Sequence, residues 1–264
     1  MKADFSVVII SYNGKGFLKR CITFLRRSSL IPQKIIVVDD NSSDGTGEMT
    51  KRDFPEVVYV RNEKNLGPSA ARNRGAKGAE GKYIVFVDND ILVRGDSIGK
   101  LLLFLDSHPE AGIAGGKLIT EKGTPMRWNM GWDPNFLREI GGKICRFLFR
   151  FGLKSLWFRD FSMSFNLNLW DYDRSIEVDW VAESFMAVGT DLFKRLGGFD
   201  EKFFMYFEGP DLSSRARKLG YKTYFVHDAV VDILNGHTHL EERNKFFRRS
   251  MLRYYLKHYF KLVS

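Results

Sequence analysis

Short runs of apolar, β-branched residues alternate with amphipathic stretches from Phe5 to Ile119. Such runs are typical of buried strands, and the amphipathic stretches between them are typical of helices. The alternation therefore predicts βαβ units around a mainly parallel sheet. The expected strands are Phe5–Ile10, Lys34–Val38, Val57–Val60, Tyr83–Val87 and Gly112–Ile119, and the expected helices are Gly16–Arg27, Gly45–Arg52, Pro68–Lys77 and Ile98–Ser107.

The hydrophobic pattern weakens after Ile119 and recovers in a second ordered block. Glycine, tryptophan and phenylalanine are prominent in the weakly periodic middle of the chain. The expected elements of the second block are a helix at Leu192–Leu196, an aromatic stretch at Phe199–Phe207, a helix at Asp211–Leu219 and a strand at Lys222–Val226. We expect one compact unit with two lobes, residues 1–119 and 120–240, followed by a basic amphipathic helix at 241–264.

The composition is that of a folded protein with a substantial core, because 44% of the 264 residues are hydrophobic and 28% are charged. Two cysteines, Cys21 and Cys145, are too few for a disulfide-stapled scaffold and favour a reducing compartment. No apolar run approaches the roughly 18 residues of a membrane-spanning helix, and the first residues lack the profile of a signal peptide. These features predict a cytoplasmic protein.

The net charge of +9 is confined to two segments. Residues 138–160 hold six basic and two acidic residues, residues 241–264 hold seven and two, and the rest of the chain is balanced. A nucleic-acid-binding surface spread over the molecule is therefore not expected.

Both basic segments have the spacing of amphipathic helices. In the first segment, Lys143, Arg146, Arg150 and Lys154 form one face, and Ile144, Phe147, Leu148 and Phe151 form another. In the tail, the basic residues Lys245, Arg249, Arg253, Lys257 and Lys261 recur beside Phe247, Met251, Tyr254, Tyr255 and Tyr259. Such helices can lie in the headgroup region of an anionic membrane, or they can cover the core with their apolar face. For the first segment we favour the membrane-binding alternative, and for the tail both alternatives stay open.

Two carboxylates directly follow the fourth expected strand, in Asp88-Asn89-Asp90. Hard oxygen donors at this spacing suit Mg²⁺ or Mn²⁺ bound together with the phosphates of a nucleotide. An Asx turn that closes the strand is the structural alternative.

Two further polar segments are expected at the same edge of the sheet, where ligands of such folds bind. The second strand ends in an acidic turn that contains Asp40, whose carboxylate can accept hydrogen bonds from a base or ribose. A Gly-Pro turn opens a small-residue helix that carries Arg72, and a helix amino end with a guanidinium suits a phosphate. For the segment with Asp40 the alternative is turn formation, and for the helix with Arg72 it is close packing on the sheet. Neither a Walker-type loop nor a GxGxxG segment occurs, so ATPases and dinucleotide-dependent enzymes lack their key element.

In this order, the segments SVVIISYN, VVDDNSSDGT, NLGPSAARNRG and FVDND resemble the nucleotide-sugar lobe of the family 2 inverting glycosyltransferases. The resemblance continues through VDWVAESFMAV and GGFDEKFFMYFEGPDLSSRARKLGY, and it is strongest for rhamnosyltransferase-like members. It implies an α/β protein with the GT-A fold. A mainly parallel nucleotide-binding sheet flanked by helices would form the 1–119 lobe, and residues 120–240 would form a smaller acceptor-side lobe.

The resemblance also implies roles for residues of the donor site. Asp40 would contact the nucleotide base, and Arg72 would lie beside the nucleotide. Asp88 and Asp90 match the DXD motif, in which Asp90 would be the more direct ligand of Mn²⁺ or Mg²⁺ and Asp88 would lie nearer the sugar and ribose. The end of the first strand would line the base pocket with Ile10, Ser11, Tyr12 and Asn13.

Two aromatic residues are implied near the donor or acceptor sugar, because an aromatic face packs well on a pyranose ring. They are Trp180 and Phe204. Core packing is the alternative for both residues and is favoured for Phe204.

The sequence departs from the family at the general base. Similar proteins usually read Glu-Asp-x-Asp, with the first Asp as the base, whereas this chain reads Glu208-Gly209-Pro210-Asp211. The expected carboxylate is missing at Gly209, so Glu208 or Asp211 would have to accept the proton. An ion pair of Glu208 with a neighbouring Arg and helix capping by Asp211 are the structural alternatives.

A second departure concerns the metal shell. In related proteins a His after the last strand can complete this shell, whereas here Asp232 stands near the expected position and His237 and His239 follow. All three residues are candidate ligands of the metal. Two surface histidines on a loop are the alternative for His237 and His239.

Together these features predict a metal-dependent inverting glycosyltransferase. It would move a hexose, rhamnose or a similar sugar, from a dTDP- or UDP-sugar to a hydroxyl of a glycan or lipid-linked glycan in cell-surface polysaccharide synthesis. The basic segments would hold it peripherally at the inner face of the cell membrane. Gly209 favours the alternative, a weakened or inactive GT-A-like module that binds a sugar nucleotide or glycan.

Overall fold

The first four strands of the chain pair in parallel. The computed structural model describes residues 4–126, 128–153, 162, 172–234 and 240–262. Strands β1 (Phe5–Ser11), β2 (Lys34–Asp39), β3 (Val58–Arg61) and β4 (Tyr83–Asp88) pair in parallel in the order β3-β2-β1-β4. Helices α1 (Lys15–Leu25), α2 (Thr46–Asp53) and α3 (Pro68–Ala76) connect them, and α4 (Ser97–Ser107) follows β5 (Ile91–Val93). The predicted βαβ alternation is confirmed to within a few residues.

The second half extends this sheet to nine strands among the described residues. Strand β10 (Phe185–Gly189) lies antiparallel between β4 and β6 (Ala111–Thr120). Strand β11 (Lys222–Ile233) runs parallel to β6 and antiparallel to β5 and to β8 (Ile176–Val178). A separate pair joins β7 (Met130–Gly131) and β9 (Trp180–Val181).

Four helices accompany the second half among the described residues. They are α5 (Phe136–Arg150), α7 (Thr190–Arg195), α8 (Glu208–Lys218) and α9 (Leu240–His258). Helix α8 starts three residues earlier than the sequence predicts, because Phe207 takes a left-handed conformation with φ of 68° and Pro210 fits within a first helical turn. Strand β11 runs well beyond the predicted Val226, through an irregularity between Val226 and Val230.

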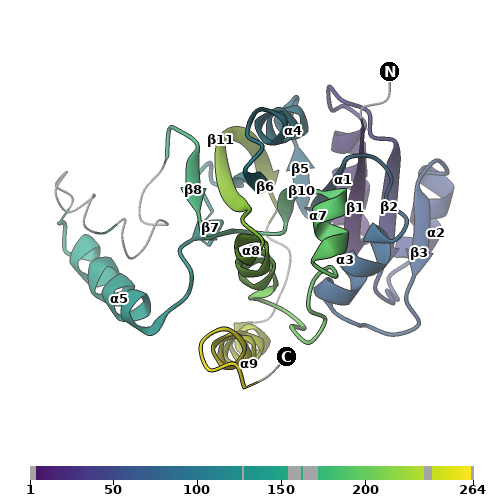
Figure 1. The fold of residues 1–264 in the computed structure, drawn as a ribbon. Helices are drawn as coiled ribbons and strands as arrows, with labels where there is room; N and C mark the ends of the chain where they lie inside the picture. The colour runs from purple at the N-terminus through teal and green to yellow at the C-terminus, as the bar shows by residue number, and fades with distance from the viewer. Residues whose placement is uncertain (1–3, 127, 154–161, 163–171, 235–239, 263–264) are drawn as a thin grey trace.

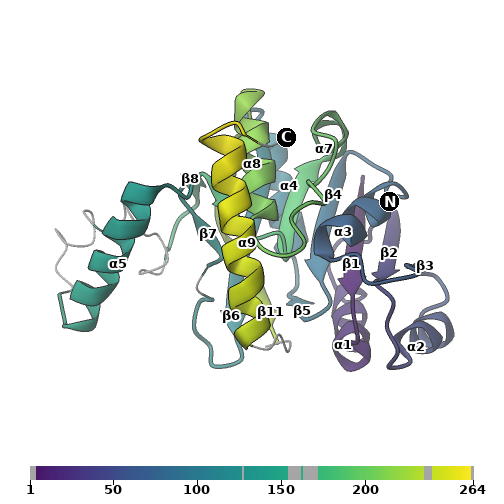
Figure 2. The same ribbon diagram turned by 90° about the horizontal axis from the view of Figure 1, so that it is seen from below.

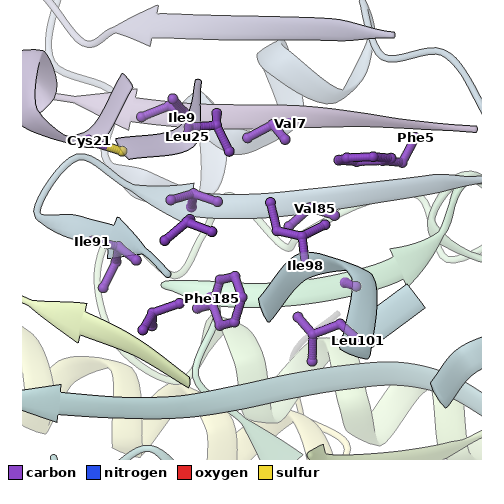
Figure 3. Packing of buried hydrophobic residues seen from close by; sticks show 14 of the residues in the cluster. Phe5, Val7, Ile9, Cys21, Leu25, Val85, Ile91, Ile98, Leu101 and Phe185 are labelled. Carbon is purple, nitrogen blue, oxygen red and sulfur yellow. The ribbon is translucent and has the colours of Figure 1, made fainter. Parts of the chain in front are cut away.

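Alternating side chains on the strands pack into two layers of helices, one on each face of the sheet. On β1, Val7 and Ile9 belong to a cluster with residues of α1 and α4, whereas Val8 belongs to a cluster with residues of α3, α7 and α8. Figure 3 shows the first cluster, with Val7 and Ile9 on the same side of the strand. The protein is an α/β fold with a mainly parallel, mixed sheet between helices (Figure 1).

The basic tail packs against the rest of the molecule, as predicted by the alternative in which its apolar face covers the core. Helix α9 runs alongside α8 (Figure 2), and Tyr254 is fully buried in a cluster with Phe203 and Phe207. Two basic residues of the tail, Arg253 and Lys257, form ion pairs with other parts of the protein and do not extend into solvent.

The other basic helix, α5, has a different environment. Figures 1 and 2 both show α5 set apart from the sheet, at the end opposite β3. Its exposed apolar side chains recur every three or four residues and form one stripe, comprising Leu137, Ile140, Ile144, Phe147 and Phe151. Within the described part of the chain, no helix is long and apolar enough to cross a membrane.

Candidate active site

The carboxyl ends of β1, β2 and β4 meet at one edge of the sheet, because the three strands are parallel neighbours. Hydrogen bonds fasten these ends together. The backbone N–H of Asp40 donates to the carbonyl of Ser11 (2.8 Å), and the N–H of Asn13 donates to the hydroxyl of Ser42 (2.9 Å). Asn89, between the two DXD carboxylates, donates to the Ser11 hydroxyl (2.9 Å). The sequence segments predicted to form the site thus lie together.

The four residues predicted to line the base pocket differ in accessibility. Ser11 is buried and Ile10 is half-buried, whereas Tyr12 and Asn13 are exposed. Asn13 has φ of 47°, a left-handed conformation that Asn tolerates. The ring of Tyr12 is therefore available at this edge, and its contact with a base remains a prediction.

Asp40 organises the loop that leads into α3. Its carboxylate is almost fully buried and accepts hydrogen bonds from the side chain of Asn62 (2.6 Å) and from the backbone N–H groups of Leu66 (3.0 Å) and Gly67 (2.8 Å). These bonds fix the turn at which α3 begins. The structure thus gives Asp40 a structural function, and its predicted contact with the nucleotide base remains a prediction.

Arg72 on α3 lies at the centre of the site. Its side chain is 3% exposed, and Nη2 donates to Oδ1 of Asp88 at 2.7 Å. Nη1 lies 3.5 Å from Oε1 of Glu208 and 3.9 Å from Oε1 of Glu183. Burial alone would lower the pKa of Arg72, but the three carboxylates raise it above its ordinary value. Arg72 is therefore a permanent cation that holds three acidic side chains around one point.

Glu183 is the member of this cluster that sequence reasoning missed. It stands two residues before β10, whose antiparallel pairing with β4 brings the N–H of Asp88 to the carbonyl of Ser184 (3.0 Å). Its side chain is 19% exposed. The available signal was a lone acidic residue directly before an apolar strand, in Val-Ala-Glu-Ser-Phe-Met-Ala-Val. Only the strand pairing shows that this residue lies beside the DXD motif.

Glu208 is buried at the start of α8, with 2% of its side chain exposed. Burial raises the pKa of Glu208 well above its ordinary value, and the neighbouring Glu183 carboxylate raises it further against the opposing effect of Arg72. Its Oε2 is buried and accepts no hydrogen bond within the described part of the protein. This environment favours the protonated, neutral form of Glu208.

Asp211 is surrounded by basic side chains and is 0% exposed. Its Oδ2 accepts from Arg215 (2.8 Å), and its Oδ1 lies 2.7 Å from Lys257 and 2.8 Å from His258. Burial would raise the pKa of Asp211, but His258, Arg215 and Lys257 hold it well below its usual range. The carboxylate links α8 to α9, an arrangement that favours a structural role over proton transfer.

The DXD segment begins at the last residue of β4, where the buried thiol of Cys21 donates to the backbone carbonyl of Asp88 at 3.6 Å. Burial raises the pKa of Cys21, and the charges of Asp90 and Asp88 raise it further. No group of three or more His, Cys, Asp or Glu residues able to hold a metal occurs within the described ranges. Mg²⁺ is usually held by one or two carboxylates together with substrate phosphates and water, so the pair fits that kind of site.

Of the three additional ligand candidates, Asp232 is in β11 and the other two, His237 and His239, lie outside the described residues. The carboxylate of Asp232 accepts from Nε of Arg94 (2.6 Å). The residue that follows β11 contacts the DXD motif, because the N–H of Leu234 donates to the carbonyl of Asp90 (2.8 Å). The role of Asp232 as a ligand remains a prediction.

The two predicted sugar-contacting aromatics are both half-buried. Trp180 donates through its indole N–H to the carbonyl of Trp132 (2.9 Å). Phe204 stacks on Phe246 with 4.9 Å between ring centroids and lies against Gly67, at which a Cβ would come within 2.7 Å of the ring. Both side chains therefore have packing partners within the protein, and their contacts with a sugar remain predictions.

Comparison with known proteins relates the chain to nucleotide-sugar transferases. The family model described as "Glycosyl transferase family 2" matches residues 6–165. An N-acetylglucosaminyl-diphospho-decaprenol L-rhamnosyltransferase of Mycobacterium tuberculosis (strain H37Rv) is 27% identical over 236 residues, which cover 85% of this chain and 74% of that protein.

Two solved structures share the fold. A mannosyltransferase of Pyrobaculum calidifontis in complex with GDP-Man and Mn²⁺ has a TM-score of 0.64 and 16% identity, and the match covers 97% of this chain and 64% of that one. GalNAc-T7 with UDP, GalNAc and Mn²⁺ has a TM-score of 0.60 and 18% identity, with 86% of this chain and 43% of that chain covered. The chain thus spans less than two thirds of either structure. The family match covers more than half of the sequence, and the chain belongs to glycosyl transferase family 2, the enzymes that use nucleotide sugars as donors.

Proposed function

We propose that this protein is a metal-dependent, inverting hexosyltransferase. It moves rhamnose or a similar hexose from a dTDP- or UDP-sugar to a hydroxyl of a glycan or lipid-linked glycan in cell-surface polysaccharide synthesis. The observation that carries the proposal is the cluster around Arg72, in which the DXD residue Asp88 and two further carboxylates converge at the carboxyl edge of the parallel strands. The mycobacterial relative, whose name specifies a rhamnosyl donor and a lipid diphosphate acceptor, supports the choice of sugar and acceptor.

The donor binds to residues 1–119 and the acceptor approaches from residues 120–240. Tyr12 stacks on the base at the end of β1, and the turn fixed by Asp40 positions α3 beside the nucleotide. Arg72 keeps Asp88 in place next to the ribose and sugar. Asp88 and Asp90 would hold Mn²⁺ or Mg²⁺, which neutralises the charge that develops on the leaving diphosphate.

The reaction needs a carboxylate that accepts the proton of the acceptor hydroxyl while that oxygen attacks the anomeric carbon. A single displacement inverts the anomeric configuration and requires no covalent enzyme intermediate. Neither predicted base suits this step as it is placed, because both oxygens of Asp211 are engaged by basic groups and Glu208 is buried and favours its neutral form.

Transfer is tested with purified protein, a panel of dTDP- and UDP-hexoses, and an N-acetylglucosaminyl-diphospho-polyprenol acceptor, with and without Mn²⁺. We expect one donor to support metal-dependent transfer, and proton NMR of the first product formed should show inverted anomeric configuration. Binding of a nucleotide without transfer from any donor would favour the alternative that Gly209 suggests, an inactive sugar-nucleotide-binding module.

We further propose that α5 rests on an anionic membrane surface at the inner face of the cell membrane. Its exposed apolar stripe includes Ile144 (53% exposed), Phe147 (61%) and Phe151 (74%), and the basic residues Lys143 and Arg150 on the same helix are also exposed. A helix with an apolar stripe and adjoining positive charge suits the headgroup region of such a membrane. This position would bring the enzyme to a lipid-linked acceptor.

Flotation with vesicles that contain anionic phosphatidylglycerol tests this proposal. The wild type should float with the vesicles at low salt, and a variant with Ile144→Ser and Phe147→Ser should not. Both side chains are largely exposed, so these substitutions should leave the melting temperature unchanged. A wild type that stays at the bottom of the gradient would contradict the assignment.

A further inference from the structure

The backbone at Gly209 leaves a space that another residue fills. A Cβ placed on Gly209 would lie 2.5 Å from Oε2 of Glu183 and 2.8 Å from the carbonyl oxygen of Val181. Distances this short do not occur between unbonded atoms of a relaxed structure, and the Val181 contact is with backbone. The carboxylate of Glu183 thus occupies the position that a side chain at 209 would have to enter.

This position is where similar proteins carry their catalytic Asp. We propose that Glu183 is the general base of this enzyme and that it replaces the carboxylate missing at Gly209. The proposal rests on the proposed transferase function and specifies the residue that performs its proton transfer. We call this the exchange between positions 183 and 209: the usual Asp is absent at 209, and an acidic side chain is present at 183.

The surroundings of Glu183 suit a base better than those of its two neighbours. Its side chain is 19% exposed, whereas Glu208 is 2% and Asp211 is 0% exposed, so an acceptor hydroxyl can reach Glu183 most readily. Two carboxylates beside each other do not both ionise easily, and the more buried one keeps the shared proton. Burial raises the pKa of Glu208 and favours its protonated form, which cannot accept a further proton.

Arg72 orients this base. Its Nη1 lies 3.9 Å from Oε1 of Glu183, while its Nη2 binds Asp88. One guanidinium therefore fixes the relation between the proposed base and the DXD residue at the donor sugar. The second oxygen of Glu183, Oε2, lies on the Gly209 side, where similar proteins carry their catalytic Asp.

The step balances as a direct displacement. The acceptor oxygen forms a bond to the anomeric carbon, and the bond from that carbon to the diphosphate oxygen breaks. The electron pair of the broken bond leaves with the nucleoside diphosphate. The hydroxyl proton moves to Glu183, which becomes a neutral carboxylic acid and later loses the proton to water.

Two variants test the assignment with the transfer assay described above. Glu183→Gln should reduce turnover by about 10²- to 10⁴-fold, the usual contribution of a general base, while nucleotide affinity stays near that of the wild type. The remaining turnover of Glu183→Gln should also no longer decrease at low pH, because the variant has no base to become protonated. The matched control, Glu177→Gln, removes a carboxylate that is 52% exposed and pairs with Lys222 on β11, and it should transfer at the wild-type rate.

The exchange is tested by returning the carboxylate to position 209. Gly209→Asp alone should be destabilised, because its side chain meets Glu183 and the carbonyl of Val181. Glu183→Gly alone should be as inactive as Glu183→Gln. The double variant, Glu183→Gly with Gly209→Asp, should recover at least a tenfold faster transfer than Glu183→Gly.

The outcomes separate the two proposals. A wild type that transfers, with Glu183→Gln at the same rate, would overturn the base assignment and leave the proposed function in place. A double variant that folds, as its melting temperature shows, but is no faster than Glu183→Gly would overturn the exchange between positions 183 and 209. A wild type that transfers no sugar from any donor would overturn the proposed function, and the base assignment with it.

Discussion

Asp211→Asn would leave three basic side chains around a neutral amide between α8 and α9. In the wild type the carboxylate is 0% exposed, and Arg215, Lys257 and His258 approach it within 2.7–2.8 Å. Their side chains are 19%, 16% and 5% exposed, so solvent compensates little for the lost partner. Removing one partner of a buried ion pair typically costs about 3–5 kcal/mol. For a chain of this size we expect the melting temperature to fall by roughly 6–20 °C.

Urea unfolding followed by circular dichroism measures the effect at pH 7. The matched control is Asp106→Asn, because Asp106 forms an ion pair with Lys82 and is 50% exposed, and an amide oxygen there can still accept the hydrogen bond from the Tyr83 hydroxyl (2.7 Å). A surface pair of this kind contributes at most about 1 kcal/mol, so the control should unfold close to the wild type.

The pH dependence supplies a second check. The pKa of Asp211 is lower in the folded protein than in the unfolded chain, so its contribution is complete above the unfolded pKa and is lost as the pH falls towards the folded value. The difference in the free energy of unfolding between wild type and variant should therefore become smaller below about pH 4. A gap under about 1 kcal/mol at pH 7 would refute the structural role. A stable Asp211→Asn protein that has lost transfer would instead point to Asp211 as the base.

Three further outcomes follow from the buried groups of the site and the tail. Glu208→Gln should raise the melting temperature relative to wild type at pH 8 but not at pH 4. The reason is that a carboxyl whose pKa is raised by folding makes the folded state less stable as pH rises. An equal change in melting temperature at both pH values, measured by calorimetry, would contradict this. Phe203→Ala, at a residue fully buried against Tyr254, should cost about 3–5 kcal/mol in urea unfolding and expose α9 to limited proteolysis; unchanged proteolysis of α9 would show that this contact does not hold the tail. Arg72→Gln should weaken nucleotide binding and destabilise the fold by several kcal/mol, because it leaves Asp88, Glu183 and Glu208 around an uncharged side chain. An Arg72→Gln variant that binds nucleotide and melts like the wild type would rule out the central role of Arg72.

Much of the sheet could be predicted from the sequence because its strands have strong local signals. The apolar runs at Phe5–Ser11 and Tyr83–Asp88 and the Gly-Pro start of α3 identify their elements without tertiary information. Since parallel strands end at the same edge, the grouping of Asp40, Arg72 and Asp88 also follows from the order of the elements.

The missing part of the site depends on tertiary pairing. Glu183 reaches Arg72 because β10 is inserted antiparallel beside β4, and the sequence of a short apolar strand does not specify its partner. The role of Asp211 was likewise hidden, because two of its three basic partners, Lys257 and His258, come from the last helix. The two basic helices have similar patterns, and only packing separates the buried Tyr254 of α9 from the exposed Phe147 of α5.

The most direct test of the central claim is calorimetric titration of the wild-type protein with dTDP, UDP, GDP and CDP, each with and without Mn²⁺. We predict that dTDP or UDP binds, that Mn²⁺ strengthens the binding because Asp88 and Asp90 share the ion with the diphosphate, and that Asp90→Asn abolishes the effect of the metal. Absence of binding by every nucleotide, at concentrations well above typical affinities and in the presence of Mn²⁺, would contradict the assignment of a donor site to this edge of the sheet.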